Sequence, residues 1–114
     1  MGEGLKMQFK RMFVDKILRG EKTQTRRLKI AWYKVGSIVP AQCGYREKAF
    51  AYLEITNIRR EWLGRISEAD IKKEGLNTMK EFVDKWVEIN KEFNMNDLIY
   101  VIDFKLTDKG RRGE

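Results

Sequence analysis

The clearest pattern of apolar and polar positions lies near the end of the chain. Between residues 98 and 106 the side chains alternate, and this period of two predicts a β-strand. One side of that strand would carry Leu98, Tyr100, Ile102, Phe104 and Leu106, and the other Ile99, Val101, Asp103 and Lys105. A second strand is predicted over residues 49–58, and shorter extended segments over residues 24–30 and 36–42. Pro40 cannot donate to a strand ladder, so its strand should lie at a sheet edge or end there.

Three segments have helical spacing. Residues 11–19 place apolar side chains four apart on one face, and Gly20 follows as a helix stop. Ser67 is predicted to cap a short helix that runs to about Glu74 and ends at Gly75. Thr78 begins a capping box for a longer helix that reaches about residue 93. Its apolar stripe is interpreted as core packing, not as a ligand surface, and comprises Met79, Phe82, Val83, Trp86, Ile89 and Phe93.

The order of these elements predicts an α+β fold, namely a small mixed β-barrel with peripheral helices. With 114 residues, the chain is expected to form one domain. Its core would span about residues 7–106, followed by a flexible basic tail over residues 107–114. Residues 43–47 are expected to form a hairpin connection, and the run from residue 57 to residue 65 is interpreted as a loop.

Composition narrows the possible chemistry. The chain has one cysteine, Cys43, and no histidine, which excludes an internal disulfide, Ser-His-Asp and Cys-His catalysis and histidine-based zinc sites. We predict no cofactor and no metal, and a hard metal held by carboxylates stays open as an alternative. No apolar run approaches the roughly 18 residues of a membrane span, and the start lacks a secretory signal. The sequence therefore predicts a cytoplasmic protein with no membrane contact and no obligate protein partner.

Charge favours an anionic partner. Lysine and arginine number 24 against 17 acidic residues, a formal net charge of +7, and RNA is the first candidate. A well-solvated surface, as in a heat-adapted protein, accounts for the charge equally well.

The segment from Gly20 to Arg27 is the most informative part of the sequence. Because Thr25 and Arg27 are two apart in a predicted strand, they should lie on one face. The turn at Gly20 would bring Lys22 near the mouth of that strand. An amine, a hydroxyl and a guanidinium would then converge. Arginine can bind phosphate or a base edge bidentately, whereas lysine acts as a point charge or, when desolvated, as a base.

These residues resemble a known family signature. The pattern Gly20-x-Lys22-x-x-Thr25-x-Arg27 is similar to that of ASCH domains, which have a PUA-like β-barrel fold, although that signature often has Glu where Thr25 stands. The resemblance covers about residues 7–106. It includes the turn Val35-Gly36-x-x-Val39, the helix end Glu74-Gly75, the spacing Phe82…Trp86 and the closing Tyr100-x-Ile102-x-Phe104.

The resemblance implies RNA binding, and for some small members deacetylation of N4-acetylcytidine by Lys, Thr and Glu. Carried over by position, Thr25 would be the nucleophile, Lys22 the base and Glu74 the proton relay. Lys22 could act only when neutral, so burial or the neighbouring Arg26 and Arg27 must lower its pKa. Glu74 would then sit beside the substrate and not on Lys22. Backbone N–H groups near residues 20–23 could hold the oxyanion.

A non-enzymatic RNA-binding module is the alternative, and a ribonuclease is a further one. Trp32, Tyr45 and Trp62 could stack on unpaired bases. Trp32 and Trp62 could instead plug the barrel ends. Ordinary structural roles also remain open for Lys22, Thr25 and Glu74. Predicted RNA or ligand contacts are Gly20, Arg26, Arg27, Trp32, Tyr45, Arg46, Arg59, Arg60 and Trp62.

Overall fold

The computed structural model describes residues 6–31, 33–44 and 46–108 of the chain. Its strands and helices follow one another as β1 (Met7–Gln8), η2 (Arg11–Phe13), α1 (Val14–Leu18), β2 (Gln24–Arg27), β3 (Ile38–Gln42), β4 (Ala51–Trp62), η3 (Leu63–Arg65), α2 (Glu68–Lys73), α3 (Met79–Asn90) and β5 (Leu98–Thr107). The predicted contacts Trp32 and Tyr45 lie outside the described residues, as does the basic end of the chain from residue 109 onward.

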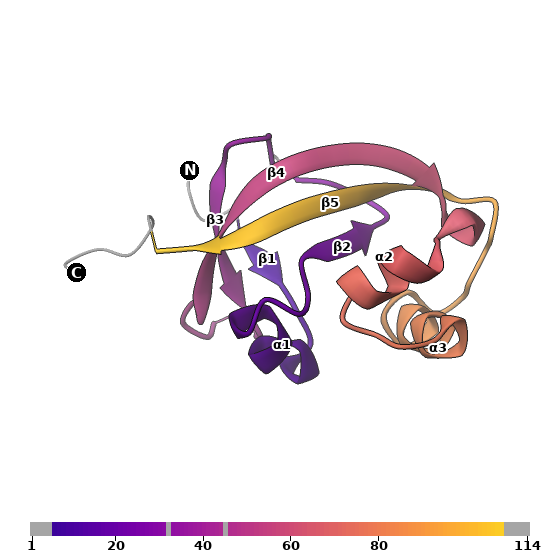
Figure 1. The fold of residues 1–114 in the computed structure, drawn as a ribbon, viewed down its shortest axis with the longest axis horizontal. Helices are drawn as coiled ribbons and strands as arrows, with labels where there is room; N and C mark the ends of the chain where they lie inside the picture. The colour runs from indigo at the N-terminus through magenta and orange to yellow at the C-terminus, as the bar shows by residue number, and fades with distance from the viewer. Residues whose placement is uncertain (1–5, 32, 45, 109–114) are drawn as a thin grey trace.

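The strands form one mixed sheet in the order β1-β3-β4-β5-β2. The β1–β3 pair is parallel, and the other three pairs are antiparallel. The long strands β4 and β5 curve side by side, so the sheet curls into a half-barrel (Figure 1). Their register shifts between Ile55 and Asn57, and such a bulge increases local twist. The predicted α+β fold with a small mixed barrel-like sheet is confirmed.

Short helices lie beside this sheet, as Figure 1 shows, with α1 near the start of β2 and α3 beside α2. The end of α2 also lies at the start of β2, where the Thr23 N–H donates to Lys73 O. Two of the helices were predicted from their caps. Ser67 Oγ accepts the Asp70 N–H at 3.1 Å, and Thr78 Oγ1 accepts the Glu81 N–H at the same distance. Helix α3 ends at Asn90, earlier than predicted, because Lys91 adopts a left-handed φ of 80°. In residues 6–31, 33–44 and 46–108, no helix has the length and apolar character of a membrane span.

The core is built from both halves of β5. Early in the strand Ile99 and Val101 are fully buried, and later Ile102 and Phe104 are buried. The buried residues therefore lie on one face early in the strand and on the other face later, instead of all on one side of the alternation. Val101 and Ile102 are both fully buried, so the curled sheet is covered on both faces at this point. The buried partners of these residues include Met7, Phe9, Phe13, Ile17, Val39, Leu53, Ile55, Leu63, Ile71 and Phe82.

Two predictions about strands were wrong. The expected loop over residues 57–65 does not form, because β4 continues to Trp62 and pairs with β5 as far as Leu98. The strand that contains Pro40 is also not at the edge, since β3 lies between β1 and β4. Pro40 is tolerated there because the short strand β1 pairs only with Ala41 and Gln42. Pro40 therefore has no β1 residue opposite it to which a backbone N–H would have to donate.

Candidate functional site

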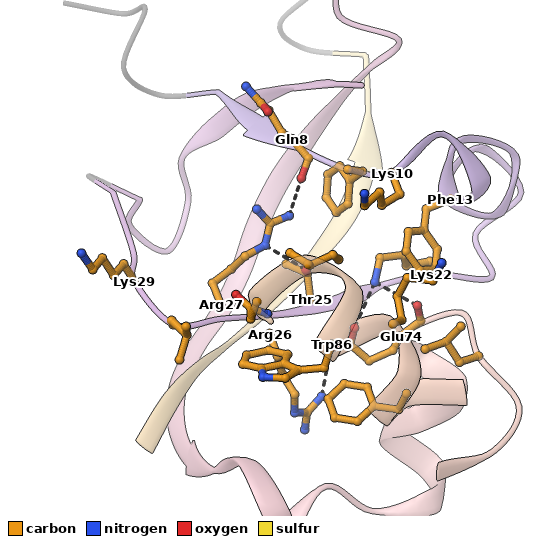
Figure 2. Close-up of a pocket in the computed structure, with 17 residues that line it drawn as sticks. Gln8, Lys10, Phe13, Lys22, Thr25, Arg26, Arg27, Lys29, Glu74 and Trp86 are labelled. Atoms are coloured by element: carbon orange, nitrogen blue, oxygen red, sulfur yellow. Dashed lines mark hydrogen bonds and ion pairs between the residues drawn. The ribbon is translucent and has the colours of Figure 1, made fainter. Parts of the chain in front are cut away.

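A cavity of about 400 Å³ lies between β2, the segment from β1 to η2, and α3. Figure 2 shows Lys22, Thr25, Arg27 and Glu74 around it. The sequence therefore predicted four of its principal polar residues. Its wall consists of Gln8, Phe9, Lys10, Phe13, Lys22, Thr25, Arg26, Arg27, Leu28, Lys29, Glu74, Leu76, Phe82, Lys85, Trp86, Ile89 and Asn90.

Lys22 is a buried amine whose three protons all have acceptors. Nζ donates to Gln24 O at 2.8 Å, to Glu74 O at 2.9 Å and to Glu74 Oε1 at 3.1 Å. It also lies 4.5 Å from the centroid of the Phe13 ring. Burial lowers the pKa of Lys22 below the usual lysine value; Glu74 acts in the opposite direction, and Arg27 and Arg26 reinforce the lowering.

Glu74 divides its carboxylate between two cations. Oε1 accepts from Lys22, and Oε2 accepts from Arg26 Nη1 at 3.1 Å. The expectation that Glu74 stands beside the substrate and away from Lys22 is therefore wrong. Its position depends on Gly75, which ends α2 with a φ of +88°. A Cβ at Gly75 would lie 3.2 Å from Lys22 Cβ, so only glycine allows this close approach without displacement.

Thr25 and Arg27 lie on one face of β2, as their spacing predicted. Arg27 Nε donates to Thr25 Oγ1 at 3.1 Å, and Arg27 Nη2 donates to Gln8 O at 2.7 Å. Arg27 thus joins the two edge strands of the sheet, β2 and β1, across the cavity wall (Figure 2). Burial lowers the pKa of Arg27. Within the described ranges no carboxylate lies within ion-pair distance of its guanidinium.

Arg26 points to the other side of β2 and is fully enclosed. Nη1 donates to Gln24 Oε1 and to Glu74 Oε2, and Nη2 donates to Glu61 Oε1 at 2.7 Å and to Asp70 Oδ2 at 3.0 Å. Although burial acts to lower it, the pKa of Arg26 is raised by these carboxylates. Its side chain is 1% exposed, a geometry that favours a positioning role over the direct ligand contact expected from the sequence.

The backbone near residues 20–23 cannot supply the expected oxyanion donors. The N–H groups of Gly20, Glu21 and Lys22 donate to carbonyls of α1, and the Thr23 N–H donates to Lys73 O at 2.8 Å. Gly20 itself is exposed and adopts a φ of +78°, which fits its predicted role in the turn. This segment therefore offers no free N–H for developing negative charge, whereas the Arg27 guanidinium already donates to Thr25 Oγ1.

The apolar stripe of α3 has a function that the sequence interpretation missed. Phe82 and Trp86 are buried, but both line the cavity, and Ile89 beside them is 51% exposed. The stripe therefore serves as core and cavity wall together. The buried Trp86 indole N–H has no acceptor in the described part of the chain. Helical periodicity alone could not show this, because core and cavity residues have the same spacing.

The remaining predicted contacts lie away from the cavity. Arg59 ion-pairs with Glu61 at 3.3 Å and with Asp70 at 2.9 Å. Arg60 is exposed on β4, where its Nη2 donates to Leu98 O and its guanidinium lies 4.2 Å from the Tyr100 ring centroid. Trp62 is also exposed. Arg46 is exposed on the connection between β3 and β4. None of these four lines the cavity.

The sequence also contained a signal for the Arg26 network. Four consecutive polar residues over Gln24–Arg27 occupy a strand whose first three side chains are buried, and such groups need internal partners. Asp70, whose N–H donates to the cap residue Ser67, places its carboxylate on Arg26 and Arg59. Although burial acts to raise it, the pKa of Asp70 is lowered by these guanidinium groups.

Taken together, the groups offer a buried amine, a hydroxyl held by a guanidinium, a carboxylate and an aromatic wall. Such a constellation can bind a planar ligand and act on an acyl group. A scan against protein-family models finds no match for the sequence. Comparison with curated proteins also finds none.

Solved structures do resemble this one. An ASCH domain from Lactobacillus crispatus is 22% identical, with 83% of this chain and 70% of that chain aligned at a TM-score of 0.62. The hypothetical protein PH0355 is 17% identical over 90% of this chain and 97% of its own, at 0.70. ASCH from Zymomonas mobilis is 11% identical over 87% of this chain and 64% of its own, at 0.64. Identities this low establish architecture and not activity. The chain therefore has the fold of the ASCH domains, a curled mixed sheet with short helices.

Proposed function

We propose that this chain binds a nucleoside unit of RNA in the cavity and removes an acyl group from its exocyclic amine, with N4-acetylcytidine as the substrate. The observation that supports this most is the convergence of Lys22, Thr25 and Glu74, from distant parts of the sequence, on one concavity. An amine that acts as base, a hydroxyl nucleophile and a carboxylate can together hydrolyse an amide without histidine.

The walls suit a base. Phe9, Phe13, Phe82 and Trp86 provide aromatic surface, and stacking on such side chains is a common way to hold a nucleobase. The unpartnered indole N–H of Trp86 offers a donor to a ligand acceptor. A volume of about 400 Å³ is in the range of small-molecule sites.

The chemistry would begin with attack by Thr25 Oγ1 on the acetyl carbon. A neutral Lys22 takes the hydroxyl proton, and Arg27 stabilises the oxyanion because it already donates to Thr25 Oγ1. When the C–N bond breaks, the protonated Lys22 returns a proton to the leaving N4 amine. Water then hydrolyses the acetyl ester on Thr25 and releases acetate. Glu74 Oε1, in contact with Nζ, holds or exchanges the lysine proton between these steps.

The test is the release of cytidine from N4-acetylcytidine by the purified protein. Thr25→Val keeps the size of the side chain but removes the nucleophile, so turnover should be lost, whereas Thr25→Ser should retain part of it. Lys22→Met and Glu74→Gln should also abolish turnover. Lys105→Ala, an exposed cation on β5, is the control and should have no effect. Wild-type protein that binds the nucleoside without releasing cytidine would contradict the proposed reaction.

A second candidate is binding without chemistry. It is favoured by the three acceptors that surround Lys22 Nζ, since they match the three N–H donors of a charged ammonium. In that case the same assay would show no turnover, and binding of single-stranded RNA would remain and would weaken with salt. Shortening of that RNA during the incubation would instead indicate a ribonuclease.

A further inference from the structure

Glu74 contacts two cations, Lys22 and Arg26, and this shared contact affects the charge state of Lys22. A carboxylate in contact with a lysine favours the protonated amine, which is the wrong state for a base. Glu74 Oε1 lies 3.1 Å from Lys22 Nζ, so it opposes deprotonation directly. On its other oxygen the same carboxylate contacts Arg26 Nη1, also at 3.1 Å. Figure 2 shows Arg26 and Lys22 approaching Glu74 from different sides.

The contacts of Arg26 make it a fixed charge. Its guanidinium is held by Gln24 from its own strand, Glu61 from β4 and Asp70 from α2, in addition to Glu74. An arginine stays charged under all physiological conditions, so its contact with Glu74 does not depend on pH in that range. These four acceptors hold the guanidinium in one orientation. Its positive charge therefore stays in contact with Glu74.

The other charged groups near Lys22 do not replace this contribution. Arg27 lies on the same strand and adds positive charge, while Lys16 of α1 donates to Gly75 O at 2.6 Å. Lys10 and Lys85 also line the cavity. On the far side of Arg26, Arg59 contacts Glu61 and Asp70 but has no contact with Glu74. Within the described ranges, Glu74 is the one carboxylate in the cavity wall, so the balance at Lys22 is decided between Glu74 and its two cations.

We propose that Arg26 is a positioning residue that neutralises Glu74 from the side opposite Lys22 and thereby allows the buried Lys22 amine to serve as a base. This inference rests on the proposed function, because that function requires Lys22 as a base. The titration of Lys22 can nevertheless be measured whether or not the protein turns over a substrate. Burial lowers the pKa of Lys22, Glu74 acts to raise it, and Arg26 acts against Glu74.

The direct measurement is the titration of Lys22 by NMR, with ¹³C-labelled lysine and Lys22→Arg to assign the Cε signal. In the wild type we expect the signal to titrate below the usual lysine pKa. In Arg26→Gln the proton affinity of the Lys22 amine should rise at least tenfold, because Glu74 then acts on Lys22 alone. Arg59→Gln is the matched control: it removes a cation from Glu61 and Asp70 but leaves Glu74 untouched, and the Lys22 titration should not change.

Arg26→Lys separates charge from packing. It retains a cation beside Glu74, so Lys22 should titrate close to the wild-type value, and this variant also serves if Arg26→Gln does not fold. A Lys22 titration that is unchanged in Arg26→Gln, or raised equally in Arg26→Lys, would overturn the inference. If N4-acetylcytidine is turned over, the alkaline rise of the rate should move with the NMR titration. Failure of turnover alone would contradict the proposed function and leave the titration result to decide the role of Arg26.

Discussion

Lys22 and Glu74 are joined twice, because the lysine amine donates to both a side-chain oxygen and the main-chain oxygen of the same glutamate. The main-chain contact, at 2.9 Å, holds the end of α2 against β2. The Thr23 N–H makes a parallel contact to Lys73 O, one residue earlier in the helix. The candidate site and the docking of α2 therefore depend on the same pair of residues.

We predict that Glu74→Ala destabilises the protein strongly. Removing one partner of a buried ion pair leaves an uncompensated charge and typically costs about 3–5 kcal/mol. Here Lys22 would lose its carboxylate at 2% side-chain exposure, while Arg26 would retain Glu61 and Asp70. Glu74→Gln keeps a hydrogen-bond acceptor for Nζ and should cost less. Urea denaturation at pH 7 measures both, with the exposed Glu92→Ala as control. Equal stability of Glu74→Ala and Glu92→Ala would contradict the double contact.

A substitution at Gly75 should separate backbone strain from damage to the site. Gly75 and Gly36 both have positive φ, +88° and +94°, so alanine at either position should cost about 1–2 kcal/mol. A Cβ at Gly36 meets nothing within 4 Å, whereas at Gly75 it meets Lys22 Cβ. We therefore expect similar losses of stability by thermal unfolding, but reduced binding or turnover of N4-acetylcytidine only in Gly75→Ala. Equal loss of function in both variants would show that strain alone is responsible.

What the sequence predicted well is local. The caps at Ser67 and Thr78, and the helix stops at Gly20 and Gly75, form within a few residues, so the local chain determines them. The end of β4 was missed for the opposite reason. Its polar residues form a strand because β5 supplies the partner, and that pairing connects segments far apart in the sequence.

The site divides in the same way. The Thr25–Arg27 contact follows from a spacing of two in a strand, and needed no knowledge of the fold. The Lys22–Glu74 contact joins residues 52 positions apart, and only the family resemblance brought them together before the structure. Glu61 and Asp70, which hold Arg26, were not predicted as site residues, because a carboxylate on a strand or helix surface has no sequence pattern that distinguishes it from a buried partner.

Stability should fall in acid as Asp70 becomes protonated. The folded-state pKa of Asp70 is lowered by Arg26 and Arg59, so its charge stabilises the fold above the unfolded-state pKa of about 3.9. That contribution is lost as the pH falls below this value through the folded-state pKa. Asp70→Asn should therefore be less stable than wild type at pH 7, and the difference should shrink below about pH 4. Urea denaturation across that range tests it, with Asp84→Asn, which removes an exposed carboxylate on α3, as control. A difference that does not vary with pH would show that packing, and not charge, is responsible.

If the chain binds RNA outside the cavity as well, Arg60 should contribute more than its neighbour Arg59. Arg59 already contacts Asp70 and Glu61, so a phosphate would have to displace two carboxylates. In the part of the chain that the structure describes, Arg60 has a carbonyl and an aromatic ring as its partners and no carboxylate, and its charge is exposed.

Each neutralised phosphate contributes about −0.7 to the slope of log affinity against log salt for a single strand. Arg60→Gln should therefore reduce the slope by roughly that amount, whereas Arg59→Gln should change it less. Fluorescence anisotropy of labelled single-stranded RNA over a series of potassium chloride concentrations measures both slopes. Equal slopes for wild type and Arg60→Gln would exclude this part of β4 from the RNA interface and confine recognition to the cavity beside Arg27.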